Sequence, residues 1–210
     1  KHTGNATANA TIGHGLSKAP ELVISKVTTH SSHIWSIFVK ELGNSNHLAF
    51  TSAASHNEWE GHEGTTASVI QLSASASSNF NLTNKDVITY AWHSVDGYSK
   101  VGTYETNGAS GDNPGAFVYL GFRPAFVMIK SVDHTNAYTK WIMFDNKRNG
   151  YNRENEYLYA DTNDDEESLI LMSQYSNGFQ VYDDYHTVNN SGTYLYIAFA
   201  ETPFKYSNAR

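Results

Sequence analysis

Short apolar segments, rather than long amphipathic ones, organise this chain. Residues 22–24 and 126–129 form continuous apolar runs, and residues 79–82 and 178–181 alternate between polar and apolar positions. Runs of about four to eight such residues between turn-rich loops are typical of β-strands. No stretch has a convincing helical period. The pattern therefore predicts a protein built from antiparallel strands.

The same order of residues occurs twice, about 104 positions apart. Residues 15–26 and 121–130 each contain a Gly, a Pro, an apolar segment and a Lys. Proline is tolerated at the first residue of a strand, where its missing N–H costs least. We therefore predict an all-β fold of two tandem antiparallel β-sandwich domains, of the jelly-roll or lectin-like type, that arose by internal duplication. The predicted domains are residues 1–100 and 101–210.

The duplication predicts which residues of the two halves are equivalent. Residues 69–72 are matched with 169–172, and residues 79–82 with 178–181. Residues shared by both halves are expected to lie in the core or in turns, because apolar strand residues are usually core. These shared pairs are Gly15 and Gly121, Pro20 and Pro124, Trp35 and Trp141, Phe80 and Phe179, and Ala91 and Ala198.

Composition and charge narrow the class of function. The net charge of −7 is uneven, with −1 in residues 1–101 and −6 in residues 102–210. An acidic chain without a basic stripe is a poor candidate for binding nucleic acid. No apolar run approaches the length of a membrane span, and without cysteine the fold cannot depend on disulfides. The expected partners are neutral or cationic surfaces, or another copy of the chain.

Residues 115–130 and 192–205 carry the most specific motifs of the chain, and Gly97–Lys100 adds to them. Together they resemble a repeat domain of tailed-phage proteins of the marine and cyanophage type. The resemblance implies an extracellular, virion-associated tail-fibre or appendage module, and it brings no catalytic residues to carry over. Further positions share the pattern: Tyr90, Trp92, Trp141, Asp145, Arg148, Tyr151, Asn152, Tyr157, Leu158 and residues 176–179.

Loops that the two halves do not share are the better functional candidates. The first contains His56, Glu58, Trp59 and His62. An indole can stack on a sugar ring while neighbouring polar groups fix the sugar hydroxyls. The alternatives are that Trp59 covers the end of the sandwich, or that these His and Glu residues with Glu63 bind zinc. We favour no metal here, because no helix aligns the ligands.

A second unshared loop contains Tyr182, Asp183 and Tyr185. Tyrosine gives a large, stiff contact area at low entropic cost, as in antibody paratopes. This loop is therefore a candidate for glycan binding or, equally, for contact with a neighbouring subunit.

A third unshared loop is acidic and contains Asp161, Asp164 and Asp165. Clustered carboxylates suit Ca²⁺, but their order differs from the calcium-loop pattern. A solvated acidic turn is the interpretation that we favour, so no cofactor is expected. Nearby, Asp145 and Arg148 are predicted to form an ion pair that braces a loop.

The sequence contains no Gly-x-Ser-x-Gly, His-Glu-x-x-His or phosphate-loop motif. The leading hypothesis is a non-enzymatic structural and adhesion protein of a virion. It would assemble as a homo-oligomer, such as a trimer, with other virion proteins and attach to a host-surface glycan. The alternatives are a host-glycan-binding lectin-like module and a polysaccharide depolymerase. Neither nucleic-acid binding nor membrane insertion is expected.

Overall fold

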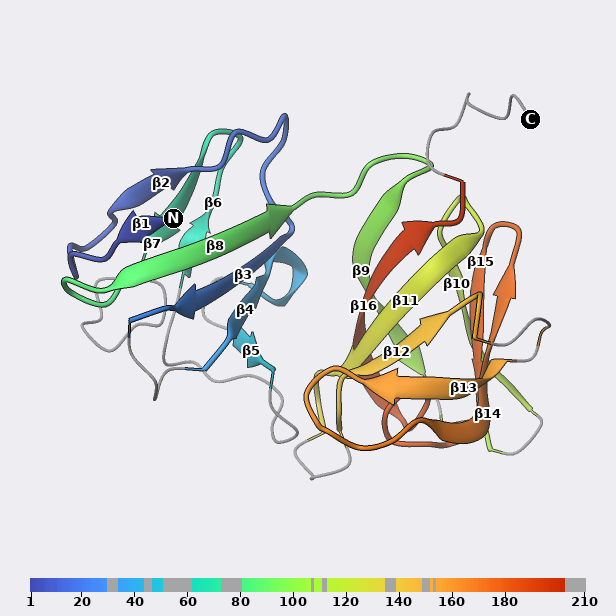
Figure 1. Ribbon diagram of the computed structural model, residues 1–210. Coiled ribbons are helices and arrows are strands. Elements are labelled where there is room, and N and C mark those ends of the chain that lie inside the picture. Colours follow the sequence, from blue (N-terminus) through green and yellow to red (C-terminus); the bar gives the residue numbers. More distant parts are fainter. Residues whose placement is uncertain are drawn as a thin grey trace. The chain divides into compact units, whose positions relative to one another are not determined.

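The computed structural model describes residues 1–29, 34–43, 47–50, 62–72, 81–106, 108–110, 113–134, 139–148, 152 and 154–202. The described residues form two compact units, with the division between His93 and Ser94 (Figure 1). We call residues up to His93 unit 1 and those from Ser94 unit 2. Apart from one short 3₁₀ turn, η1 (Lys40–Leu42), the regular structure described is β-strand. Within it, no helix has the length and hydrophobicity needed to cross a membrane.

The described part of unit 1 forms two antiparallel sheets. One sheet has the order β1-β8-β3-β4-β5, and the other has the order β2-β7-β6. The strands are β1 (His2–Thr3), β2 (Thr11–Gly13), β3 (Leu22–Val27), β4 (Ser36–Val39), β5 (His47–Ala49), β6 (His62–Thr65), β7 (Val69–Leu72) and β8 (Asp86–Trp92).

The described part of unit 2 forms one antiparallel sheet with the order β10-β15-β14-β13-β12-β11-β16-β9. Its edge strands β9 and β10 also contact each other, so the sheet is nearly closed, like a barrel. The strands are β9 (Ser99–Thr106), β10 (Pro114–Tyr119), β11 (Pro124–Ser131), β12 (Ile142–Asp145), β13 (Glu154–Tyr159), β14 (Glu167–Tyr175), β15 (Gly178–Tyr182) and β16 (Gly192–Ala200).

The two units use the same strand order. β1-β8-β3-β4-β5 of unit 1 corresponds to β9-β16-β11-β12-β13 of unit 2, and β2-β7-β6 corresponds to β10-β15-β14. The difference is the pairing of β13 with β14, which joins the two groups of strands in unit 2. The register of the central strands also agrees. Val23 lies opposite Ala91 and Phe38 in unit 1, as Val127 lies opposite Ala198 and Phe144 in unit 2.

Each unit has its own apolar core. Unit 1 buries Val23, Phe38, Ile70 and Leu72 between its two sheets. Unit 2 has a larger core that is rich in aromatic residues. In this core the ring of Tyr104 stacks on Tyr194 at 5.3 Å and meets Phe179 edge to face at 6.0 Å, measured between ring centroids. Such aromatic pairs each add about 0.5–1.5 kcal/mol beyond the burial of their surface.

The prediction of an all-β, antiparallel fold is confirmed. Unit 2 differs from a sandwich of two separate sheets, because β13 and β14 pair and make its sheet continuous. The predicted boundary between residues 100 and 101 lies within β9, and residues 94–100 belong to unit 2. β11 begins at Pro124 as expected, whereas β3 begins two residues after Pro20.

Two of the predicted equivalences are wrong. Residues 69–72 form β7, which takes the place of β15 rather than of residues 169–172 in β14. Residues 178–181, in β15, therefore correspond to 69–72 and not to 79–82, of which Phe80 lies outside the described residues. The apolar composition of the segments suggested the wrong match, and only the pairing partners distinguish them.

The matching of Trp35 with Trp141 agrees with the register, since each stands three residues before the phenylalanine that lies opposite the central valine. The expectation that both are core residues is wrong for Trp35, which is 38% exposed while Trp141 is fully buried. Both tryptophans lie on the sheet face opposite that phenylalanine, because side chains alternate along a strand. In unit 2 the buried Lys130 lies over the Trp141 ring, whereas Trp35 stacks on the half-exposed Tyr90.

We predict that Phe144→Ala lowers the free energy of unfolding of unit 2 by about 3–5 kcal/mol, because it leaves a cavity in a closely packed core. The exposed Phe117 provides a matched control, and Phe117→Ala should cost well under 1 kcal/mol, on the scale of ordinary surface changes. Urea denaturation followed by fluorescence measures both. Equal losses for the two variants would contradict the assignment of this core.

Candidate functional site

Strand β10 turns two large aromatic side chains toward solvent. Phe117 is 47% exposed and Tyr119 is 61% exposed, while Val118 between them is buried in the core of unit 2. This follows from the period of two in a strand, which places residues 117 and 119 on one face and residue 118 on the other. Exposed aromatic residues that share one sheet face are a candidate binding surface.

The neighbouring β14–β15 hairpin adds a third exposed ring. Tyr175, at the end of β14, is 37% exposed, and its ring meets the Phe117 ring at 6.0 Å and 61°. Gly178 pairs with Tyr119 on one side and with Tyr175 on the other. A Cβ atom at residue 178 would lie 2.1 Å from the Val118 carbonyl oxygen and 3.2 Å from the Phe117 ring. Glycine is therefore needed for β10 to pair this closely with β15, and it leaves room for the Phe117 ring.

Polar groups border these rings. The Tyr182 hydroxyl lies 3.0 Å from the Tyr175 hydroxyl and donates to Gln180 Oε1 at 3.4 Å. Gln180 lies opposite Phe117 on β15. Each aromatic ring is thus next to a group that can donate or accept a hydrogen bond. We call Phe117, Tyr119 and Tyr175, with Gln180 and Tyr182 beside them, the aromatic face.

Unit 1 lacks the aromatic face at the equivalent positions. By strand register, Thr11 and Gly13 replace Phe117 and Tyr119, and Thr66 replaces Tyr175. Gln71, however, occupies the place of Gln180. The fold therefore does not require aromatic residues at these positions, and only unit 2 carries exposed rings there.

The structure separates the residues of the predicted Tyr182 loop. The ring of Tyr182 is only 6% exposed, and its hydroxyl is directed toward the aromatic face. The Tyr185 hydroxyl instead lies 3.3 Å from that of Tyr159. Asp183 lies between them in a left-handed turn with φ of 61°. His56, Glu58 and Trp59 of the other predicted loop lie outside the described residues, as does the side chain of His62, whose backbone begins β6.

A tyrosine cluster surrounds Glu167 at the start of β14. Glu167 Oε2 accepts hydrogen bonds from the hydroxyls of Tyr157, at 3.0 Å, and Tyr159, at 3.4 Å. Burial raises the pKa of Tyr157 well above its ordinary value, and the hydrogen bond to Glu167 adds to the effect. Burial, followed by the hydrogen bond to Tyr185, raises the pKa of Tyr159 similarly. These phenols therefore stay protonated and brace the end of the barrel-like sheet.

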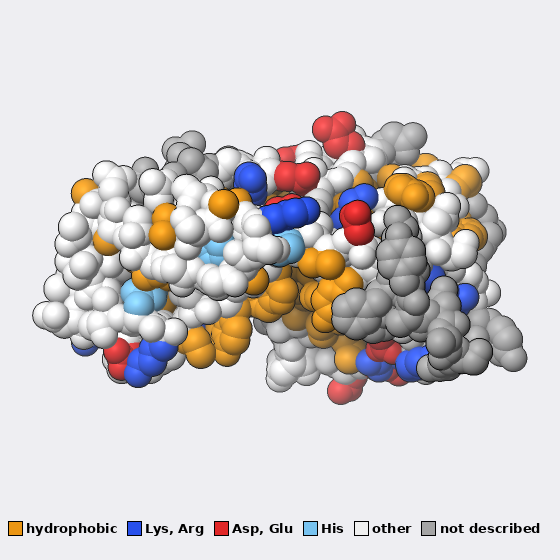
Figure 2. All heavy atoms as spheres, turned by 90° about the horizontal axis from the view of Figure 1, so that it is seen from above, with side chains coloured by type: hydrophobic (Ala, Val, Ile, Leu, Met, Phe, Trp, Pro, Cys, Tyr) orange, Lys and Arg blue, Asp and Glu red, His pale blue; other side chains and the backbone are white. Residues whose placement is uncertain are grey.

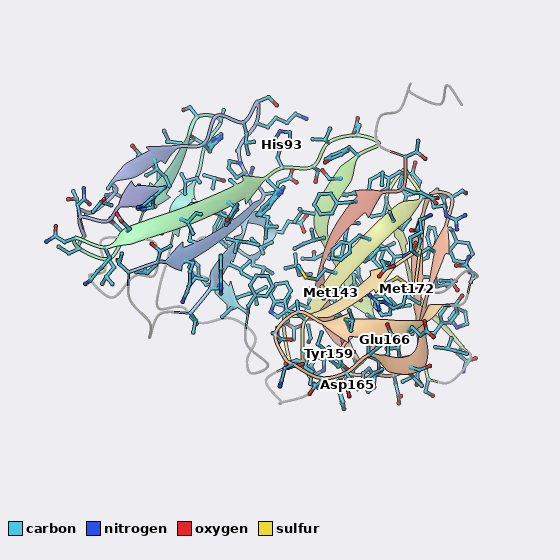
Figure 3. All side chains as sticks on the ribbon, viewed as in Figure 1. His93, Met143, Tyr159, Asp165, Glu166 and Met172 are labelled. Atoms are coloured by element: carbon cyan, nitrogen blue, oxygen red, sulfur yellow. The ribbon has the colours of Figure 1, made fainter. Side chains whose placement is uncertain are left out.

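The predicted acidic turn lies beside basic side chains. Asp164 forms an ion pair with Lys140 at 2.5 Å and accepts a hydrogen bond from the Thr162 hydroxyl. Asp161 accepts the Trp141 N–H at 3.0 Å. Asp165 is exposed and directly precedes Glu166, and the two lie just before the start of β14 in unit 2 (Figure 3). Across the described ranges, no group of three or more His, Asp or Glu side chains has the arrangement of a metal site.

Arg148 links two acidic side chains near this turn. Its guanidinium pairs with Asp145 at 3.1 Å and also contacts Glu166. The predicted ion pair of Asp145 and Arg148 is therefore confirmed. Because all three side chains are partly exposed, the pairs brace the loop with a small net stabilisation.

Lys130, on the central strand β11, is fully buried. Its ammonium donates to the Thr139 carbonyl and lies 5.9 Å from the centre of the Trp141 ring. Burial lowers the pKa of Lys130 to about 8, opposed by the nearby Asp161 carboxylate. In turn, burial raises the pKa of Asp161.

A Ser–His–Asn arrangement occurs after β11. Ser131 Oγ lies 2.8 Å from His134 Nδ1, and His134 Nε2 lies 3.0 Å from Asn190 Oδ1. Ser131 is fully buried, and its hydroxyl also accepts the His134 N–H. A nucleophile must reach its substrate, so this arrangement holds a turn rather than forming a catalytic centre.

Unit 1 carries a different aromatic surface. The ring of Tyr90 lies 6.5 Å from Trp35 and 6.0 Å from Trp92, with interplanar angles of 29° and 23°. Tyr90 is 44% exposed, and Ile34 beside this row is exposed as well. Trp35 and Tyr90 provide a matched control for the aromatic face, because they are exposed to a similar extent but lie in the other unit.

Charges of both signs are mixed on the surface. Figure 2 shows Lys and Arg side chains beside Asp and Glu side chains on the face that it draws. The ion pairs Arg123–Glu201 and Lys147–Glu201 of unit 2 are examples of this mixing. A surface of this kind suits a neutral ligand better than a polyanion.

The fold and the site together define an all-β protein of two units, with an exposed aromatic face on the second. The chain belongs to the family described as "Domain of unknown function (DUF7483)", whose model matches residues 1–203 and so spans both units. No curated protein and no solved structure matches the chain.

Burial of Lys130 leads to a prediction about the effect of pH on stability. Its pKa is about 8 in the folded protein and near 10.5 in the unfolded chain. Between these values the unfolded chain binds more protons, so the free energy of unfolding rises with pH in this window. The rise attributable to Lys130 is at most about 3 kcal/mol. Urea denaturation from pH 7 to pH 10.5 measures it.

Lys130→Met is the matched variant for this measurement, because methionine has a similar length and no titrating group. As pH rises from 8, the free energy of unfolding of the wild type should increase relative to that of Lys130→Met. A difference that stays constant from pH 7 to pH 10.5 would show that this lysine is not desolvated as described.

Proposed function

We propose that this chain is a non-enzymatic adhesion module and that the aromatic face of unit 2 binds carbohydrate. The observation that supports it most is the exposure of Phe117, Tyr119 and Tyr175 on one face of a rigid sheet. Large aromatic side chains are usually buried, at least in part, in the protein interior. Three that remain exposed together beside hydroxyl and amide groups, at positions where unit 1 has small or polar residues, support a ligand at this face.

The polar groups of the face favour a sugar over an apolar surface as that ligand. A pyranose ring has an apolar C–H face and a rim of hydroxyls, so it needs both a ring to stack on and hydrogen-bond partners. The Tyr175 and Tyr182 hydroxyls and the Gln180 amide provide such partners beside the rings. A shallow site of this kind binds weakly, with a Kd on the order of 1 mM to 10 μM, or about 4–7 kcal/mol.

We further propose that the two units arose by duplication of one β-sandwich ancestor. The identical strand order of the units supports this, as does the equal register around Val23 and Val127. Gly15 and Gly121 also both adopt positive φ, at 69° and 84°. After duplication, unit 1 can maintain the structure while unit 2 acquires a binding face.

Weak binding by each copy is useful when many copies act together. We therefore propose a homo-oligomer, in keeping with the sequence resemblance to virion-associated fibre and appendage modules, which attaches to host-surface glycans. Light scattering should give a mass that is a multiple of the 23.3 kDa chain. A single species of 23.3 kDa at all concentrations would contradict this part of the proposal.

An array of neutral glucose-, galactose- and mannose-based oligosaccharides tests carbohydrate binding. Wild-type protein should bind at least one series. Phe117→Ala and Tyr175→Ala should each weaken binding about five- to tenfold, since each loses a stacking contact of about 1–1.5 kcal/mol. Trp35→Ala removes an exposed ring of unit 1 and should leave the affinity unchanged.

Two results would overturn the proposal. One is the absence of binding to every oligosaccharide on the array. The other is binding that Trp35→Ala abolishes while the variants of the aromatic face retain it. The release of new reducing ends from a bound polysaccharide would instead indicate a depolymerase.

A further inference from the structure

A pocket of about 360 Å³ adjoins the aromatic face at the end of β10. Tyr119 belongs to both, because its ring is exposed on the aromatic face and also lines the pocket. The pocket is also lined by Ser94, Asp96, Lys100 and Gly121. The pocket has about the volume of a small-ligand site, and it is formed by residues of unit 2.

Two tight turns build this pocket. Asp96 and Gly97 form the tip of a turn that is closed by paired hydrogen bonds between Val95 and Ser99, and Gly97 has φ of 71°. Gly121 forms the other turn, also with positive φ. A Cβ atom at residue 121 would lie 3.7 Å from the Tyr119 hydroxyl, so the Tyr119 side chain reaches over this turn.

Lys100 fixes the position of Tyr119. Its ammonium donates to the Tyr119 carbonyl at 2.7 Å and lies 5.6 Å from the centre of the ring. A cation near an aromatic face is attracted to the ring by about 0.5–1 kcal/mol when both are exposed. The pocket therefore contains one ammonium, one exposed carboxylate on Asp96, the Ser94 hydroxyl and an aromatic wall.

We propose that this pocket holds the terminal sugar of a neutral glycan, and that the next sugars of the chain lie on Phe117 and Tyr175. This inference rests on the proposed function and adds which part of the glycan is recognised. The lining contains one negative charge, on Asp96, and one positive charge, on Lys100, so the pocket has no net charge, which matches a neutral ligand. A carboxylate and an ammonium together can accept from and donate to the several hydroxyls at a chain end.

Short and long sugars should depend on different residues for binding. A methyl glycoside is long enough for the pocket alone, whereas a hexasaccharide also covers the aromatic face. Loss of a hydrogen bond to a charged group costs about 1.5–3 kcal/mol, or about tenfold or more in affinity. Residues of the pocket should therefore affect both ligands, and residues of the aromatic face only the longer one.

Calorimetric titration with the methyl glycosides and hexasaccharides of glucose, galactose and mannose tests this inference. Asparagine tolerates this turn as aspartate does. Asp96→Asn should therefore keep the turn and weaken the binding of both the methyl glycoside and the hexasaccharide of the bound series about tenfold. Phe117→Ala should weaken the hexasaccharide by about as much and leave the methyl glycoside unchanged. Unfolding midpoints equal to that of wild type serve as the control for folding.

The outcomes separate this inference from the proposed function. In one outcome, Phe117→Ala weakens binding of the hexasaccharide, Asp96→Asn has no effect, and methyl glycosides do not bind. This outcome would contradict the proposal of a terminal-sugar pocket and would support the carbohydrate-binding face. If none of the six sugars binds, both proposals fail.

Discussion

The pairing of the central strand β11 with β16 and β12 is the constraint on which the rest of unit 2 depends. Val127 is fully buried, with Ala198 on one side and Phe144 on the other. This register directs the odd-numbered residues 127 and 129 into the core. A shift by one residue would move the entire apolar set to the opposite face. The register around Val23 in unit 1 is the same, so the central strands of both units pack in the same way against their neighbours.

The aromatic face follows from that core. Phe179 and Val181 of β15 point into the barrel-like sheet, so Gly178, Gln180 and Tyr182 lie on its outer side. Strands β10 and β14 flank β15, which brings Phe117, Tyr119 and Tyr175 together although up to 58 positions separate them in the chain. The core is thus the rigid support that holds the exposed rings in place, and rigid aromatic contacts lose little entropy on binding.

Some features of the fold could be predicted from the sequence because their cause is local. Alternating or continuous apolar runs determine strands, and the Gly–Pro–apolar–Lys order marked the entry to β11 and the approach to β3. The matching of β7 with the wrong strand had a different origin. Two apolar segments of similar composition are distinguished only by the strands with which they pair, and pairing is a property of the whole sheet.

The candidate site was harder to predict for the same reason. The sequence shows that Phe117 and Tyr119 would lie on one face of a strand and Val118 on the other. It does not show which of the two faces is exposed to solvent. Tyr175 joins them only across β15, which depends on the β14–β15 register and on the absence of a side chain at Gly178. Tyr182, which the sequence did single out, contributes its hydroxyl while its ring is largely buried.

The most direct test of the central claim is to map the bound sugar by NMR. Aromatic side-chain signals would be followed while a neutral hexasaccharide is added. The account predicts that the signals of Phe117, Tyr119 and Tyr175 shift together, with those of Trp35 and Trp92 unchanged. Shifts confined to the tryptophans of unit 1, with the rings on β10 and β14 unaffected, would contradict it.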